Sequence, residues 1–325
     1  MTRLLRDSPI EFRALRDATA ERLGTDARAI EKDYWATEVL RSASAEVGRS
    51  SQVSVVPAHT VVFKGGTSLS KAYGLIRRFS EDVDLLVVTD AKGKPLRRIL
   101  EGIADHAAHS LGLPFEREHA GRGYLNVRFR TPTVNPAPFL SNGVLLELGS
   151  RGGPAPNTLR RVGSMMMDAA GAIDPSALRE FTDLKPFEIL TLAPERTLAE
   201  KLAFLHHRAS VGDLAALRRG ARHLYDITLV LRDSGVRAAL ADGAMEHLMR
   251  DVDARSAAAG WPFSPRPDTG FATSPAFADT SSTMGATEIR DALTEGLRGI
   301  EELVWGDLPS LDECIAEVHR WSQLL

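Results

Sequence analysis

The clearest structural pattern in this chain is VVFKGGTSLSKAYGLIRRFSEDVDLLVV, residues 61–88. It begins with β-branched and aromatic residues that predict a strand. Gly65 and Gly66 follow, and glycine lets the backbone turn sharply and approach a ligand closely. Thr67 and Ser68 then open a predicted helix, so free backbone N–H groups and two hydroxyls gather at its N-terminus, where a phosphate is favoured. The turn is therefore a candidate cradle for a triphosphate.

The end of the same stretch carries two acidic residues. Asp82 and Asp84 are two positions apart, so on the predicted strand both carboxylates leave the same face. Like charges held this close repel one another unless a cation lies between them, and Mg²⁺ binds through one or two carboxylates together with substrate phosphates. A phosphate cradle followed by an Asp-x-Asp strand is the plan of a nucleotidyltransferase of the polymerase-β type. Taken alone, each motif is more often a simple turn or a solvated strand end.

This stretch resembles motif I of the AbiEii/AbiGii family of nucleotidyltransferase toxins, which includes the MenT-like toxins that modify tRNA. The likeness rests on KGGTSL at residues 64–69, on Tyr73 and on RFSEDVDL at residues 78–85. The resemblance implies an α/β (α+β) protein of two lobes, a polymerase-β-like nucleotidyltransferase lobe with a mixed sheet and a mainly helical C-terminal lobe. In the first lobe it implies that Lys64 takes part with the turn in binding the nucleotide.

Length and composition agree with an ordinary globular protein. The chain has 325 residues, of which 43% are hydrophobic and 26% charged, and this length predicts two domains. We expect a nucleotidyltransferase domain over residues 1–186 and a helical domain over residues 187–325. The single cysteine, Cys314, excludes an internal disulfide framework and is expected in the core. We find no signal-peptide pattern and no apolar run of about 20 residues, so the cytoplasm is the expected compartment.

The net charge of −3 argues against a protein coated in positive charge. It does not exclude RNA, because nucleic-acid binding depends on local patches rather than on the sum of charges. Basic pairs occur at residues 77–78, 97–98, 160–161 and 218–219. Each pair alone is interpreted as a solvated surface, although the first and last pairs could line one cleft.

The remaining elements follow from hydrophobic periodicity. Helices are predicted over residues 9–23, from about 27 to 39, and over 95–111, 194–205, 288–305 and 311–324, and strands over 124–130, 144–148 and 187–192. Residues 31–35, EKDYW, also resemble the family's N-terminal segment, but we interpret Lys32 and Asp33 as surface charges. Residues 149–171 give a weak pattern with a methionine run interpreted as core filler, and residues 254–287 predict a long irregular loop.

Glu147 is the third acidic candidate. It interrupts the apolar strand VLLEL at residues 144–148, where burying an unpaired charge is costly. Because polymerase-β-type sites take an acid from a neighbouring strand, Glu147 is a candidate to complete the metal site and deprotonate the acceptor hydroxyl. The alternative is a strand-end glutamate paired with Arg128 or Arg151.

Two further blocks resemble the family. PERTLAEKLAFL at residues 194–205 places Lys201 at the edge of an apolar helical face, and RHLYDI at residues 222–227 places Asp226 among apolar residues. From the residues alone, Lys201 and Asp226 form a structural ion pair. The resemblance implies instead that Lys201 contacts the nucleotide triphosphate and that Asp226 orients Lys201 or the acceptor.

The resemblance implies the toxin of a toxin–antitoxin pair, with an active site between the two lobes. Its expected substrates and partners are an NTP with Mg²⁺, the tRNA acceptor end and a cognate antitoxin, and we expect a monomer without membrane contact. The alternatives are a nucleotidyltransferase that modifies a hydroxyl of a protein or a small molecule such as an aminoglycoside, and a nucleotide-binding module that has lost catalysis. The retained aspartates and lysine argue against the last alternative.

Overall fold

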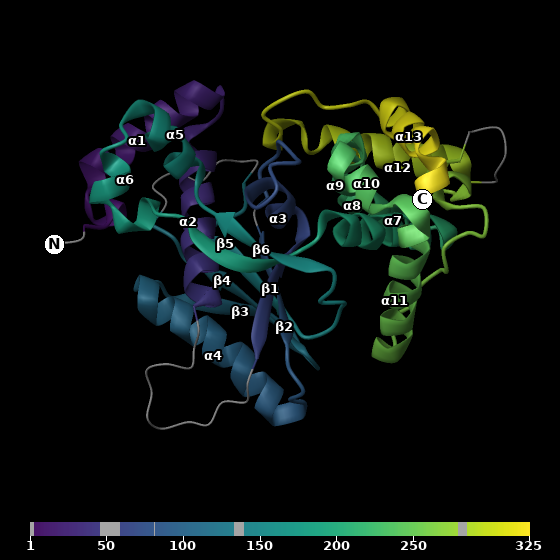
Figure 1. The fold of residues 1–325 in the computed structure, drawn as a ribbon, viewed down its shortest axis with the longest axis horizontal. Coiled ribbons are helices and arrows are strands. Elements are labelled where there is room, and N and C mark those ends of the chain that lie inside the picture. The colour runs from purple at the N-terminus through teal and green to yellow at the C-terminus, as the bar shows by residue number, and fades with distance from the viewer. Residues whose placement is uncertain (1–2, 46–58, 81, 133–139, 279–284) are drawn as a thin grey trace. The chain divides into compact units, whose positions relative to one another are not determined.

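The structure is a computed structural model that describes residues 3–45, 59–80, 82–132, 140–278 and 285–325. Contacts divide the chain into two compact units, one made of Met1–Ala72 with Phe79–Thr191 and the other of Tyr73–Arg78 with Leu192–Leu325. The first unit holds a seven-stranded mixed sheet, and the second is built from helices (Figure 1). The predicted α/β fold class is confirmed.

The sheet of the first unit has the strand order β3-β4-β5-β2-β1-β7-β6. β2 pairs with β1 in antiparallel and with β5 in parallel, β4 is antiparallel to both β5 and β3, and β7 is parallel to β1. The strands are β1 (Thr60–Lys64), β2 (Asp82–Val88), β3 (Phe115–Gly121), β4 (Tyr124–Phe129), β5 (Val144–Gly149), β6 (Asn157–Val162) and β7 (Phe187–Leu192). The strand expected at residues 187–192 thus pairs with β1, and all but its last residue belongs to the first unit.

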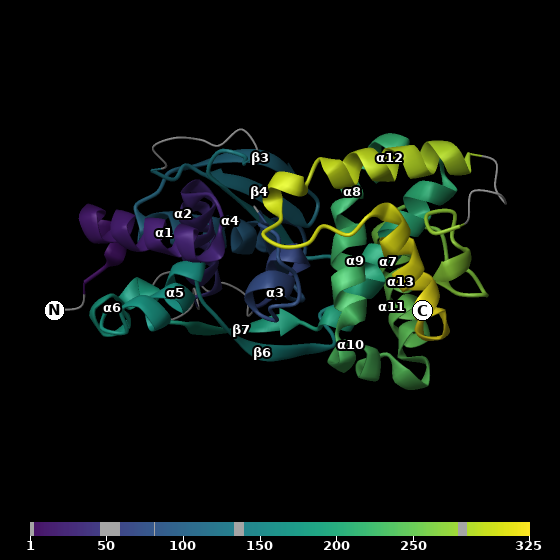
Figure 2. The same ribbon diagram turned by 90° about the horizontal axis from the view of Figure 1, so that it is seen from above.

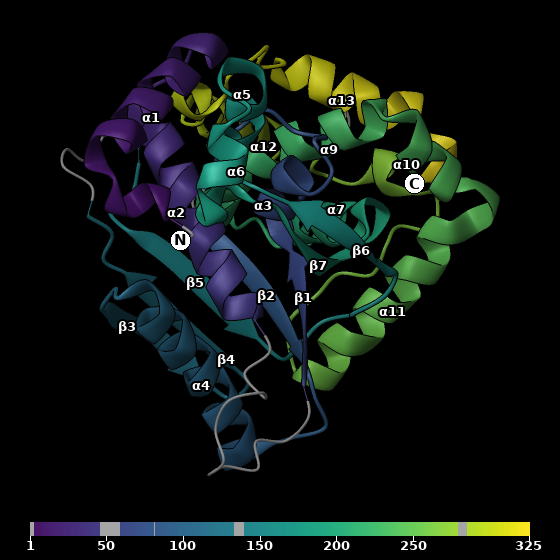
Figure 3. The same cartoon turned by 60° about the vertical axis from the view of Figure 1, so that its left-hand side comes forward.

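One face of the sheet is apolar and covered by helices. Alternate residues of the central strands, including Val83, Leu85, Val127 and Leu146, have at most 1% of their surface exposed. The helices α2 (Ala27–Ser44) and α4 (Gly93–Leu111) pack along this part of the sheet and against each other (Figure 3). Because strand residues alternate between faces, the other set of side chains on β2, β4 and β5 leaves from the opposite face.

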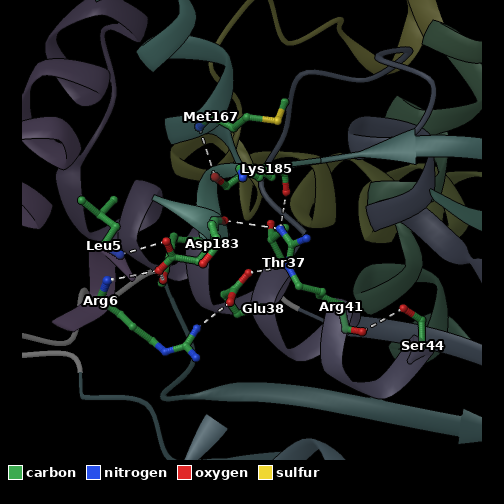
Figure 4. A network of polar contacts seen from close by, with 12 residues as sticks. Leu5, Arg6, Thr37, Glu38, Arg41, Ser44, Met167, Asp183 and Lys185 are labelled. Atoms are coloured by element: carbon green, nitrogen blue, oxygen red, sulfur yellow. Dashed lines mark hydrogen bonds and ion pairs between the residues drawn. The ribbon is translucent and has the colours of Figure 1, made fainter. Parts of the chain in front are cut away.

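The N-terminal segment is tied to this unit by a buried polar network. Asp183 accepts hydrogen bonds from the backbone N–H of Leu5 at 2.8 Å and of Arg6 at 3.2 Å (Figure 4). Arg6 forms an ion pair of 2.7 Å with Glu38 on α2, and Arg41 donates to the carbonyl of Lys185 at 2.6 Å. The N-terminal segment and the segment between β6 and β7 are thereby joined to α2.

The helices α1 (Pro9–Leu23), α5 (Met165–Ile173) and α6 (Ala177–Glu180) complete the first unit together with α3 (Gly65–Lys71). α1 packs on α2 and α5, as Figure 2 shows. Of the methionine run, Met166 is fully buried, and Met165 and Met167 are partly exposed. The core-filler interpretation therefore holds fully for Met166 alone.

The second unit is a cluster of helices. They are α7 (Pro194–Ser210), α8 (Leu214–Gly220), α9 (Arg222–Arg232), α10 (Ser234–Ala239), α11 (Ala244–Ala259), α12 (Ala286–Arg298) and α13 (Leu311–Arg320). The predicted apolar face of α7 is confirmed, because Leu198, Leu202 and Leu205 are fully buried, and Cys314 is in the core as expected. No helix among the described residues is both long and apolar enough to cross a bilayer.

Several predictions about the chain are wrong. The helix expected over residues 288–305 ends at Arg298. The loop expected from residue 254 begins later, because α11 continues through an alanine-rich stretch to Ala259 and ends at Gly260, whose φ is +68°. Within the loop Phe277 is fully buried while Trp261 is 47% exposed; residues 279–284 lie outside the described part. Lys32 and Asp33 are not surface charges, since they are only 9% and 8% exposed.

Candidate functional site

The glycine turn lies directly against an acidic side chain. Gly65 has a φ of +80°, and a Cβ atom built on it would overlap Oδ2 of Asp84 and lie 3.0 Å from its Cγ. The register explains this closeness, because β1 and β2 are antiparallel and Lys64, the residue before Gly65, is opposite Asp84. A side chain at position 65 would therefore be both strained and in collision with the carboxylate. The structure brings the predicted turn and one predicted metal ligand into contact.

The two hydroxyls after the glycines point into the protein. Thr67 is 1% exposed and its hydroxyl donates to the carbonyl of Asp82, and Ser68 is fully buried and donates to the carbonyl of Gly65 at 2.8 Å. The first bond holds the start of α3 against the start of β2, and the second lies within the first turn of α3. The predicted contact of both hydroxyls with a phosphate stays a prediction. Because the first N–H groups of a helix have no partner within the helix, the backbone N–H groups of the turn are the donors that could bind a phosphate.

A row of polar residues crosses the open face of the sheet at the level of Asp84. Lys64 on β1, Asp84 on β2, Glu147 on β5 and Asn126 on β4 are consecutive partners in register. Neighbouring strands are about 4.8 Å apart, so Asp84 and Glu147 are adjacent on one face. Asn126 Nδ2 donates to Glu147 Oε1 at 2.6 Å, which orients that carboxylate.

Arg128, one alternative partner of Glu147, lies in the next row, opposite Leu145, and forms an ion pair with Glu118 on β3. Glu147 is half-buried. The burial cost expected for this glutamate is thus offset at least in part by the amide of Asn126.

A pocket of about 200 Å³ opens over this polar row. Its lining includes Lys64, Asp84, Leu86, Tyr124, Asn126, Glu147, Gly149 and Arg151. Four of the eight can be charged, and they come from three strands and from the loop after β5. Tyr124 and Arg151 are lining residues for which the sequence alone gave no site role, because their closeness to Asp84 depends on strand order.

Asp82 is two residues before Asp84 on the same strand, so its side chain leaves the same face. Among the residues described in the structure, no group of three or more His, Cys, Asp or Glu side chains is close enough to form a complete metal site. Two carboxylates beside the glycine turn still fit Mg²⁺, which is commonly held by one or two carboxylates with the rest of its ligands from substrate and water.

A buried ion pair joins the end of α3 to α2. Lys71, the last residue of α3, pairs with Asp33 on α2 and donates to Thr37 Oγ1 at 2.7 Å. The other oxygen of Asp33 accepts from the backbone N–H of Met165 at 2.7 Å. Sequence analysis missed this role because the partners are 38 residues apart. The signal in the sequence was that Asp33 directly precedes two aromatic residues, Tyr34 and Trp35; the structure shows their helix to be buried almost throughout.

Lys201 and Asp226 are paired in the second unit. Lys201 Nζ lies 2.8 Å from Asp226 Oδ2 and 3.1 Å from Nδ1 of His223. Arg78 is the second cation on Asp226, with two contacts of 2.7 Å, and only 3% of it is exposed. The interpretation of residues 77–78 as a solvated pair is therefore wrong for Arg78.

Burial raises the pKa of Asp226, but Arg78 and Lys201 outweigh this effect and hold the pKa well below its usual range. Burial lowers the pKa of Lys201, although Asp226 opposes the change. Burial and the charge of Lys201 also lower the pKa of His223 well below its ordinary value. His223 is then neutral, and its Nδ1 can accept a hydrogen bond from the Lys201 ammonium.

The family described as "Nucleotidyl transferase AbiEii toxin, Type IV TA system" matches residues 53–316. No curated protein matches the chain. Among solved structures, the nucleotidyltransferase toxin MenT4 from Mycobacterium tuberculosis H37Rv is similar, with 18% identity, a TM-score of 0.41 and coverage of 95% of this chain and 94% of that one. JHP933 from Helicobacter pylori is also similar, with 15% identity, a TM-score of 0.33 and coverage of 86% and 94%.

Proposed function

Because this chain belongs to the AbiEii family of nucleotidyltransferase toxins from type IV toxin–antitoxin systems, we propose that it transfers NMP from an NTP to an acceptor hydroxyl in a Mg²⁺-dependent reaction. We further propose that the acceptor is the 3′ end of tRNA, so that the modified tRNA no longer supports translation. The contact between Asp84 and the Gly65 turn, with Glu147 beside it, is the observation that carries the proposal.

In this reaction Asp82 and Asp84 would hold Mg²⁺, which supplies positive charge for the attacking and leaving oxygens. The backbone N–H groups of Gly65 and Gly66 bind the triphosphate, with Thr67 and Ser68 fixing the turn and Lys64 adding charge. Glu147, oriented by Asn126, takes the proton of the acceptor hydroxyl. The hydroxyl oxygen forms a bond to the α-phosphorus, and the bond from that phosphorus to the pyrophosphate oxygen breaks.

Lys201 is proposed to neutralise triphosphate charge, and Asp226 to orient Lys201. The 2.8 Å ion pair supports the second role. It also supports the alternative of a purely structural pair, since only 6% of Lys201 is exposed. NTP affinity separates the two, because a structural lysine should alter stability without altering the Kd for NTP in protein that remains folded.

The choice of tRNA rests on family membership more than on surface charge. Arg78 is occupied by Asp226, so the basic pairs named earlier can offer Arg77 but not Arg78 to an RNA phosphate. Arg218 is 48% exposed at its side chain and pairs with Glu295, and Arg219 is exposed. The second candidate acceptor is therefore a hydroxyl of a protein or small molecule. An antitoxin partner follows from the family, and we propose a monomer that acts in the cytoplasm, where its substrates are.

Labelled NTPs offered singly with total tRNA test this proposal. Half of the tRNA sample is first oxidised with periodate, which destroys the diol of the 3′-terminal ribose. We expect label from at least one NTP in intact tRNA and none in oxidised tRNA. Labelling that survives oxidation rejects the 3′ end, and label in added protein or aminoglycoside but not in tRNA favours the second acceptor.

A further inference from the structure

We propose that the space above Gly149, beside the polar row of Asp84, is a slot for a nucleobase. The inference rests on the proposed function, because it identifies the chemistry of a substrate group at the same site. The slot lies at a second row of residues across the sheet, two residues along each strand from the row of Asp84.

This second row contains a gap. Leu86 on β2, Gly149 on β5 and Tyr124 on β4 are consecutive partners in register. A Cβ atom built on Gly149 would meet no atom within 4 Å. Gly149 is the last residue of β5, and a glycine in a strand often marks a place where a ligand approaches the backbone closely. The open space here lies between two residues that do carry large side chains.

The walls of the gap are apolar and fixed by neighbours. The ring of Tyr124 lies over Gly121 on β3, where a Cβ atom would be 2.7 Å from Cζ and 2.8 Å from the hydroxyl. Leu86 is 2% exposed, and Gly152 covers it closely enough that a Cβ there would be 3.6 Å from Cδ1. The Tyr124 ring therefore leans away from Gly149, and 44% of Tyr124 remains exposed for a ligand.

The dimensions suit a flat ring. Leu86 and Tyr124 are on the strands to either side of β5, so about 9–10 Å separates their strands. A base above Gly149 needs contacts of roughly 3.5–4.0 Å on each face, or about 7–8 Å in total; Tyr124 supplies the accessible contact, while Leu86, only 2% exposed, bounds the space. Aromatic side chains and Arg guanidinium groups are the surfaces on which single-stranded bases stack, and Arg151 also lines the pocket.

The slot is also at the right separation from the reacting groups. Two residues along β2 join Asp84 to Leu86, a rise of about 7 Å. One ribose with its exocyclic carbon spans such a length between a base and a phosphate or a 3′ hydroxyl. Asn126 belongs to the row of Asp84, lies two residues along β4 from Tyr124, and has an amide that can bond to the edge of a base.

Filling the slot is the direct test, and Gly149→Val does so with little strain, because position 149 is in a strand, has no positive φ and leaves room for Cβ. Gly102→Val on α4 is the matched control, since its Cβ would also meet nothing within 4 Å. Tyr124→Ala removes one wall. Equilibrium Kd values are measured for each NTP, for inorganic triphosphate and for total tRNA, with circular dichroism melts to verify folding.

We expect Gly149→Val and Tyr124→Ala to raise one Kd by about 5-fold to about 100-fold, the range for losing one stacked base. A higher Kd for NTP with inorganic triphosphate unchanged assigns the slot to the incoming nucleotide. A higher Kd for tRNA alone assigns it to the acceptor's terminal base. If the Kd values for NTP and for tRNA both match those of Gly102→Val, the slot is rejected. It is also rejected if the Kd for inorganic triphosphate rises as much as the Kd for NTP. A wild-type protein that binds these ligands but transfers no nucleotide would reject the proposed function and leave the binding result standing.

Discussion

Gly65→Ala tests the contact on which the proposed chemistry depends. Alanine would have to adopt the φ of +80° and place its methyl group where Asp84 Oδ2 now lies. The backbone strain is on the order of 1–2 kcal/mol, which lowers stability without abolishing folding. The overlap is a separate effect, because it forces the carboxylate to move or rotate away from the turn.

The expected loss of activity comes from that displacement. A contact below 3.0 Å is not tolerated by a real Cβ, so the carboxylate must give way. A misplacement of roughly 1 Å at a catalytic group costs about 10²-fold in rate. We therefore expect kcat for nucleotide transfer to fall by about 10²-fold in Gly65→Ala.

Gly24→Ala is the matched control. Gly24 has a φ of +62° at the end of α1, and a Cβ there would meet nothing within 4 Å. It carries the same kind of strain without the collision. Both variants are compared with wild type in a labelled-NTP transfer assay and in thermal melts. Equal activity of Gly65→Ala and Gly24→Ala would refute the claim that Asp84 must stay against the turn.

Further predictions concern buried charges. Asp33→Ala leaves Lys71 buried without its carboxylate, so the free energy of unfolding measured in urea should fall by about 3–5 kcal/mol; a fall below about 1 kcal/mol would mean that the pair is not effectively buried. The pKa of Asp226 is held below its usual range, so its ionised form stabilises the protein above about pH 4 and this stabilisation is lost as the pH falls further. The melting temperature of Asp226→Asn should be lower than that of wild type at pH 7 and should fall less between pH 5 and pH 3. An equal fall of the two melting temperatures over this pH range would contradict this. Lys201→Ala should raise the Kd for NTP in folded protein, and an unchanged Kd would leave Lys201 as the structural partner of Asp226.

The sequence predicted the central part of the fold because local rules determine it. Alternation along the strand places Asp82 and Asp84 on one face, and the glycine pair marks the turn with which α3 begins. These inferences needed only residues close together in the chain. The plan of polymerase-β-type sites further predicted Glu147 on a strand beside that of Asp84, and β5 does pair with β2.

The remaining features depend on partners far apart in the chain. The edge strands β3 and β6 were missed because most of their residues are exposed, so neither has the alternating pattern of a half-buried strand. Asp33 was interpreted as a surface charge because no local pattern reveals Lys71 as its partner. Arg78 was misread for the same reason, since Asp226 is 148 residues away.

The most direct test of the account is nucleotide transfer by Asp84→Asn across a Mg²⁺ titration. Asparagine keeps the size of the side chain near Gly65 but removes the charge that would hold the ion. Asp105→Asn, on the exposed side of α4, is the control for losing a carboxylate elsewhere. We predict that Asp105→Asn behaves as wild type, that EDTA stops transfer, and that Asp84→Asn loses at least about 10²–10³-fold in kcat with its melting curve preserved. Transfer by Asp84→Asn at the wild-type rate, or full wild-type activity in excess EDTA, would contradict the account.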